Sequence, residues 1–120
     1  MSKEEKMKRS NVLMELELNE DAVTSVQFTT PEGWSVTVQA RCDTGASMSS
    51  IDECLANFLS VKLLSDTVKV RNAHGKSERH VCKLTFSCEA GEITSQFNIS
   101  DRSTLSQPVL IGRDILFLEE

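Results

Sequence analysis

The sequence lacks several features that would assign it to a familiar class. It contains no tyrosine, two prolines and one tryptophan, and no apolar run reaches the roughly 20 residues of a membrane span. Lysine and arginine number thirteen against eighteen aspartates and glutamates, which gives a net charge of -5. A nucleic-acid-binding surface normally needs a basic patch, and a secretion signal needs an apolar stretch near the start. We therefore expect a cytoplasmic protein without a nucleic-acid or membrane partner.

The cysteines also lack a recognisable pattern. Cys42, Cys54, Cys82 and Cys88 form no C-x-x-C pair, and three of them fall at apolar positions of expected strands or a helix. This spacing argues against a zinc site made of thiolates. Because a free cysteine behaves as a small apolar side chain, we predict buried, reduced thiols.

What the sequence does contain is a repeated alternation of apolar and polar residues, which is typical of strands with one buried face. We expect residues 1–11 to form a flexible arm and residues 12–120 to form a single domain, since 120 residues suit one domain. Pro31 and Gly33 supply the chemistry of a tight turn, and residues 74–76 resemble a hairpin tip. The predicted strands cover residues 12–18, 26–28, 34–42, 67–73, 82–88, 93–99 and 108–111.

The spacing of apolar residues changes from that of a strand to that of a helix in one place. Ser50 and Glu53 have the spacing of a helix capping box, and a helical apolar stripe follows it, so we predict a short helix packed on the core. A second helical turn is expected over residues 113–118. Many short strands with one or two short helices predict an all-β barrel or sandwich. The stripe consists of Ile51, Cys54, Leu55, Phe58 and Leu59.

The candidate chemistry lies at the end of the third predicted strand, where the chain reads Asp43-Thr44-Gly45-Ala46. An Asp-Thr-Gly tripeptide alone is a weak signal, because most such tripeptides mark turns. Here an apolar strand leads into it, and Gly45 permits close approach of the backbone. A second apolar strand, Leu110-Ile111-Gly112, precedes a polar and then an apolar helical start.

These two segments resemble the pepsin and retropepsin superfamily, in which an Asp-Thr-Gly-Ala loop is supported by a segment of two apolar residues and glycine. The sequence is most similar to bacterial and archaeal retropepsin-like proteins that are labelled ATP-dependent zinc proteases and found beside ribosomal-protein glutamate ligases. Their motifs match four segments in order, over about two thirds of the 120 residues. The matching segments are residues 40–46, 75–81, 101–103 and 108–113.

The resemblance implies a retropepsin-like acid protease barrel that acts as a homodimer, with Asp43 of each subunit activating a water that hydrolyses a peptide bond. Its substrate would be an extended peptide or protein, and no cofactor and no metal are expected. Cys42 departs from the family, where an aliphatic residue usually precedes the aspartate. The sequence also leaves little room for a C-terminal interface strand, so residues 12–18 or another surface would join the subunits. The implied support residues of the active-site loop are Thr44, Gly45, Ala46, Leu110, Ile111, Gly112 and Arg113, and the implied flap and substrate-binding residues are Asn72, Ala73, His74, Gly75, Lys76 and Arg79.

Other interpretations of the same residues remain. The chain could be a non-catalytic dimerisation or peptide-binding module with this fold, in which Asp43 is an ordinary turn residue. It could also be a metal-dependent hydrolase using Asp43 with His74 and His80, although two histidines flanking a turn are more often solvated and there is no H-E-x-x-H motif. Structural roles are expected for Arg113 and Asp114 in an ion-pair network under the loop, and for Asp101 and Arg102 in fixing their own loop.

Overall fold

The computed structural model describes residues 11–72 and 75–119. Its longest strands are β5 with 14 residues and β4 and β6 with 10 residues each, and its helices have one or two turns. The elements in chain order are α2 (Val12–Glu15), β1 (Val23–Thr29), β2 (Ser35–Cys42), β3 (Ser50–Asp52), α3 (Glu53–Phe58), β4 (Leu63–Asn72), β5 (Gly75–Cys88), β6 (Gly91–Ser100), β7 (Val109–Ile111) and α4 (Arg113–Leu116).

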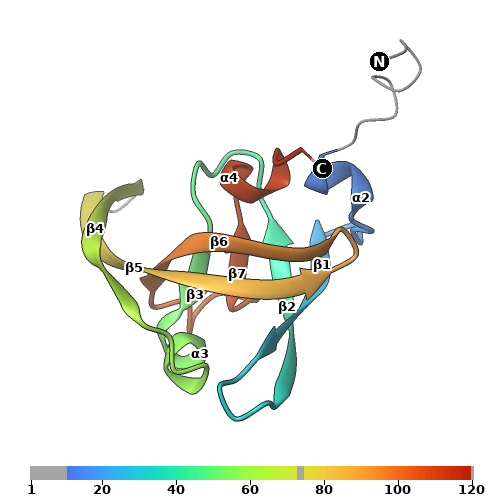
Figure 1. The fold of residues 1–120 in the computed structure, drawn as a ribbon. Coiled ribbons are helices and arrows are strands. Elements are labelled where there is room, and N and C mark those ends of the chain that lie inside the picture. Colours follow the sequence, from blue (N-terminus) through green and yellow to red (C-terminus); the bar gives the residue numbers. More distant parts are fainter. Residues whose placement is uncertain (1–10, 73–74, 120) are drawn as a thin grey trace.

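The strands form one seven-stranded sheet in the order β1-β2-β7-β3-β6-β5-β4. Strand β1 also pairs with β5, with Phe28 opposite Phe86, so six strands close into a barrel. Strand β4 lies outside this closed ring, attached through β5, and the β4–β5 hairpin extends away from the β1–β2 hairpin (Figure 1). The prediction of an all-β barrel with short helices is confirmed.

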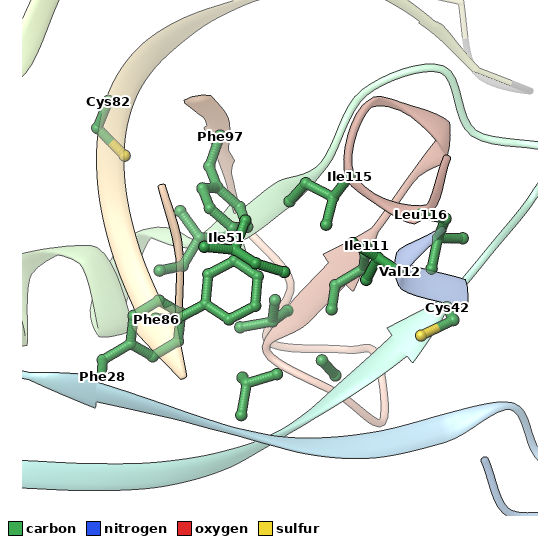
Figure 2. Close-up of a cluster of buried hydrophobic side chains, with 14 of the residues drawn as sticks. Val12, Phe28, Cys42, Ile51, Cys82, Phe86, Phe97, Ile111, Ile115 and Leu116 are labelled. Atoms are coloured by element: carbon green, nitrogen blue, oxygen red, sulfur yellow. The ribbon is translucent and has the colours of Figure 1, made fainter. Parts of the chain in front are cut away.

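The barrel is filled by aliphatic side chains around three phenylalanines. Phe28, Phe86 and Phe97 contact one another in tilted or edge-to-face pairs, with ring centroids 5.9 to 6.5 Å apart, and all three are almost fully buried (Figure 2). Such pairs add about 1 kcal/mol to the gain from burying their area. The core continues through β3 and β7 to the buried residues of α4, so packed side chains close the end of the barrel near α4.

The strand predicted over residues 12–18 was wrong. Residues 12–15 form helix α2, because the side chain of Asn11 caps it by accepting a hydrogen bond from the Met14 amide (3.0 Å). Val12 is buried, but Met14 and Leu18 are exposed, so the apolar alternation does not correspond to one buried face. The predicted flexible arm lies outside the described residues except for Asn11, which forms an isolated β-bridge with Glu119.

The predicted capping box was also wrong, although the helix itself exists. Ser50 lies in β3, and the cap is Asp52, whose side chain accepts a hydrogen bond from the Cys54 amide (3.0 Å). Strand β3 extends to Asp52 because it is sandwiched between β6 and β7 in the sheet. Of the predicted stripe, Ile51 and Leu59 are buried and Leu55 is half-buried, whereas Cys54 and Phe58 are exposed.

The cysteines likewise differ in how far they are buried. All four are free thiols, and Cys42 and Cys82 are buried as predicted, while Cys88 is half-buried and Cys54 is exposed. Burial raises the pKa of the Cys82 thiol to about 11. Burial, and next the nearby Cys88, raises the pKa of the Cys42 thiol to about 11. None of the helices in the described part of the chain has the length and apolar character needed to cross a membrane.

Candidate active site

Asp43 follows directly after β2 and is half-buried. Its backbone amide donates to the carbonyl of Ile111 in β7 (2.9 Å), which extends the parallel pairing of β2 with β7 by one residue. Its carboxylate oxygen Oδ1 accepts a hydrogen bond from the Gly45 amide (2.8 Å). A side chain at position 45 would bring a Cβ within 3.1 Å of that same oxygen. Gly45 therefore lets the loop fold tightly against the carboxylate.

Gly112 supports this loop from below. A Cβ at position 112 would lie 2.8 Å from the carbonyl oxygen of Ala46 and 3.0 Å from the carbonyl carbon of Met48, both of them backbone atoms. The Gly112 amide donates to the hydroxyl of Ser49 (2.9 Å), and the Arg113 amide donates to the carbonyl of Ala46 (2.8 Å). Two backbone segments thus pack together with no space for a side chain between them.

Asp114 fixes the far end of the loop. Its carboxylate accepts hydrogen bonds from the Ser49 amide (3.1 Å) and from the Ser49 hydroxyl (2.7 Å), while Arg113 donates from Nη1 to the Thr44 carbonyl (3.1 Å). We expected these two residues to form an ion-pair network, but their described contacts are hydrogen bonds to the loop. The structural role predicted for them agrees with this geometry.

A hollow of about 360 Å³ opens beside Asp43. Its other side is the loop that leads into β7, in which the Arg102 side chain donates from Nε to the Gln107 carbonyl (3.0 Å). Asp101, expected with Arg102 to fix this loop, accepts a hydrogen bond from the Ser103 amide (2.9 Å). Hydrogen bonding with the side chain of Ser103, and next with its backbone amide, lowers the pKa of Asp101. Its lining includes Arg41, Asp43, Arg102, Ser106 and Leu110.

A second hollow, of about 480 Å³, lies between the Asp43 loop and the β4–β5 hairpin. Gly45 and Ala46 form one wall, and Arg79 of β5 lines the other, together with residues 68–71 of β4. Asn98 on β6 holds Arg79 in position by accepting a hydrogen bond from Nη1 (3.0 Å). Arg102 and Leu110 line both hollows, so the two are neighbours around Asp43.

The predicted flap residues are therefore only partly beside the hollow. The hairpin exists, with Asn72 opposite Gly75, and Arg79 lines the hollow. Gly75 and Lys76 are exposed near the tip and do not line it. Ala73 and His74 lie outside the described residues.

The residues named for the loop, in contrast, are brought together. Thr44 is exposed at its turn, Leu110 and Ile111 form β7 with Val109, and Arg113 begins α4. His80, the second histidine of the metal hypothesis, is exposed on β5 opposite Thr67. Within residues 11–72 and 75–119, no three His, Cys, Asp or Glu side chains are grouped so that they could hold a metal ion.

Most of the polar side chains around the two hollows were not predicted from the sequence. Asn98 accepts hydrogen bonds from both Ser50 and Arg79, and Asp52 accepts one from the Arg102 amide (2.7 Å). Arg41 could have been found, because alternation with the buried Ala40 and Cys42 puts it on the opposite face of β2. The β4 residues gave no signal, since their approach to the loop depends on how the hairpin curves.

Comparison with solved structures gives the fold a name. The solution structure of the simian foamy virus (mac) protease is similar, with a TM-score of 0.54 and 15% sequence identity over 78% of this chain and 89% of that one. A Legionella pneumophila protein of unknown function, Lpg0085, is similar with a TM-score of 0.52 and 19% identity over 78% of this chain and 82% of that one. The fold is thus a retropepsin-like barrel. No known family profile matches the sequence, and no curated protein matches it.

Proposed function

We propose that this chain is a homodimeric aspartic endopeptidase in which Asp43 of each subunit shares one catalytic water. The observation that carries the proposal is the support of Asp43: its carboxylate is fixed by the Gly45 amide at 2.8 Å, on a loop seated against the backbone at Gly112, and it borders an open hollow. A catalytic carboxylate needs such a rigid base, because reacting groups must be held within a fraction of an ångström. Asp101 makes the same turn contact with the Ser103 amide, so the feature that distinguishes Asp43 is the seat of its loop against the backbone at Gly112.

The mechanism follows from pairing two such carboxylates. Two carboxylates a few ångströms apart cannot both ionise easily, so one keeps its proton and the pair titrates as a unit. The ionised member accepts a proton from the water, and the resulting hydroxide equivalent attacks the amide carbonyl carbon. The protonated member donates its proton to the carbonyl oxygen. The member that took the proton of the water then gives it to the former amide nitrogen, the other member recovers a proton from a hydroxyl of the tetrahedral intermediate, and the carbon–nitrogen bond breaks, which returns the dyad to its starting state.

In this proposal the second carboxylate comes from a second chain, since these 120 residues contain one Asp-Thr-Gly. A symmetric dimer would bring the two loops together about a twofold axis. Exposed apolar side chains near the termini are candidates for its interface: Met14 on α2, and Phe117 and Leu118 after α4, are each more than 40% exposed. They would take the place of the strand that we had expected over residues 12–18.

The narrower relationship, to the bacterial and archaeal group labelled ATP-dependent zinc proteases, is part of the proposal. It is supported by the four ordered motifs, two of which, residues 40–46 and 108–113, meet in the contacts of the loop with Gly112 and Arg113. In this proposal the zinc in the label has no catalytic part, and the extended substrate occupies the hollow below the β4–β5 hairpin.

The test is cleavage of a diverse peptide library from pH 4 to 8, read by mass spectrometry, with the original protein and with Asp43→Asn. Asparagine keeps the shape but cannot titrate. Cuts made by the original protein alone, and unchanged by a metal chelator, are expected. Asp66→Asn, an exposed change on β4, is the matched control and should cut normally.

Equal cutting by Asp43→Asn would refute the catalytic role of Asp43, and loss of cutting with the chelator would favour a metal-dependent hydrolase. Absence of cuts at every pH would favour the peptide-binding module. Sedimentation of the intact protein tests the dimer independently of cleavage.

A further inference from the structure

Positive charge gathers around the two hollows although the chain as a whole is acidic. Five of its thirteen lysines and arginines line them, in a protein of net charge -5. In the part of the chain that the structure describes, Asp43 is the only acidic residue of either lining. The remaining surface therefore has the opposite sign to the hollows, which favours an anionic ligand in them. The five cations are Arg41, Lys69, Arg71, Arg79 and Arg102.

Arg102 is the most unusual of these cations, because it is only 8% exposed and yet lines both hollows. Its backbone amide donates to Oδ1 of Asp52 (2.7 Å), and its Nε donates to the carbonyl of Gln107 (3.0 Å). The other carboxylate oxygen of Asp52 accepts the Cys54 amide (3.0 Å). Asp52 thus accepts hydrogen bonds from two backbone amides, one at the start of α3 and one in the loop before β7. It forms no described hydrogen bond with the Arg102 guanidinium.

The terminal nitrogens of Arg102 have no hydrogen-bond partner within residues 11–72 and 75–119. No fully buried side-chain nitrogen or oxygen in these residues lacks a partner, so the terminal nitrogens must reach the open space of the hollows. A guanidinium placed in this way presents donors in a planar fork that matches a carboxylate.

The surroundings of Arg102 favour an anion as well. Burial, and next the charge of Arg79, lowers the pKa of the Arg102 guanidinium; Asp52 opposes this effect, and Arg41 adds to it. Arg79 and Arg41 therefore each repel the largely buried guanidinium of Arg102. A bound carboxylate would relieve that repulsion and supply the missing hydrogen-bond acceptor.

We propose that Arg102, assisted by Arg41, binds a carboxylate of the substrate beside the scissile bond. Both arginines share the 360 Å³ hollow with Asp43, so the carboxylate would belong to a residue adjacent to the bond that is cut. Two groups of a peptide could supply it: the side chain of Asp or Glu, or the free C-terminus. The first would give cleavage at acidic positions, and the second would give trimming of chain ends. This inference rests on the proposed peptidase function.

Binding to the Asp43→Asn protein tests the inference without requiring catalysis. Three octapeptide pools are compared in retention by the protein, read by mass spectrometry: end-capped peptides with Glu at each position in turn, the same peptides with Gln, and neutral peptides with a free C-terminus. We expect at least about a tenfold preference for Glu over Gln at one position, or for the free acid over its amide, as charge-assisted hydrogen bonds give. Whichever pool shows the preference identifies the source of the carboxylate.

Variants then assign the preference to residues. Arg102→Gln and Arg41→Gln should each reduce it at least threefold, whereas Lys83→Gln, which removes an exposed charge on β5 outside both hollows, should leave it unchanged. If Arg102→Gln does not fold, Arg41→Gln decides, because Arg41 is exposed on β2. Equal retention of Glu and Gln peptides and of acid and amide, or an equal loss in Lys83→Gln, overturns the inference.

Cleavage by the original protein separates this inference from the proposed function. End-capped neutral peptides cut as fast as both the acidic and the free-acid peptides would leave the peptidase standing and refute the carboxylate site. Retention of acidic peptides through Arg102, with no peptide cut by the original protein, would keep the carboxylate site and refute the peptidase.

Discussion

The Asp43 loop and the projecting part of the β4–β5 hairpin line the same hollow, but they are held in different ways. Residues 43–49 rest on the backbone of Gly112 and Arg113 and end in the fully buried Ser49. Residues 63–71 of β4, in contrast, include no buried residue and pair only with β5. Segments with few buried contacts open at low free energy, whereas segments in the core open only with the whole fold. In the proposed enzyme, a fixed catalytic group would thus face a hairpin that can open to admit a peptide.

The largest effect should come from Gly112→Ala. The new Cβ would lie 2.8 Å from the Ala46 carbonyl oxygen, and since both partners are backbone, neither can turn aside. We expect a loss of about 3 kcal/mol in the free energy of unfolding, measured by urea denaturation. Gly75→Ala in the hairpin is the matched control, because its Cβ meets nothing and only its φ of +116° is unfavourable, at about 1 kcal/mol. Equal losses in the two variants would mean that the loop is not tightly seated.

Thiol chemistry gives the next effect. Burial, and next Cys88, raises the pKa of Cys42, the residue before Asp43, from 9.0 to about 11, so at any pH below 9 its thiolate is about a hundredfold scarcer than that of an ordinary cysteine. Alkylation of the native protein at pH 8, followed by peptide mapping, should modify the exposed Cys54 at least about a hundredfold faster than Cys42. Similar rates would show that the end of β2 opens readily.

The same shift predicts how stability depends on alkaline pH. A thiol whose pKa is raised in the folded state stabilises the fold fully below the unfolded pKa, and this contribution is lost as pH rises through the folded value. Stability should therefore fall between about pH 9 and 11, and Cys42→Ala should reduce the steepness of that fall in urea denaturation. An unchanged slope in Cys42→Ala would contradict the assignment to Cys42.

A smaller loss is expected for Asp114→Ala. It removes the acceptor of the two Ser49 hydrogen bonds at 2.7 and 3.1 Å, which should cost about 2 kcal/mol in the free energy of unfolding. Asp66→Ala on the exposed face of β4 should change the same quantity by less than about 0.5 kcal/mol. If the two variants lose the same amount, Asp114 does not anchor the loop.

The smallest effect belongs to the hairpin. Thr67 donates from its hydroxyl to Glu78 across the β4–β5 pair, and both residues are exposed. Thr67→Val should therefore change the free energy of unfolding by no more than about 0.5 kcal/mol, since exposed cross-strand pairs contribute little. A larger loss would show that the hairpin is part of the cooperative core, and the contrast with the loop would disappear.

The two regions also differ in how far the sequence predicted them. The strand that leads into Asp43 and the glycine of its turn leave local marks in the sequence, whereas the support of this loop by Gly112 was expected only from the resemblance to the retropepsin family. The helix at residues 12–15 was missed because four alternating apolar residues resemble a strand, while the decisive feature is the Asn11 cap. The cationic lining was missed because Lys69 and Arg71 reach the hollow only through the curvature of the hairpin, and curvature is not encoded in a window of residues.

Strand β5 belongs both to the projecting hairpin and to the closed barrel. Residues 75–80 pair with β4 alone and are mostly exposed, whereas residues 81–88 pair with β6, and Phe86 and Ser87 also pair with β1. A single continuous strand therefore spans the outer hairpin and the closed ring. Its amide protons should exchange with deuterium at two rates, with the early residues reporting the opening of the hairpin and the later ones the unfolding of the barrel. A peptide that binds under the hairpin would slow amide exchange in the first set and leave the relative exchange rates within the second set unchanged.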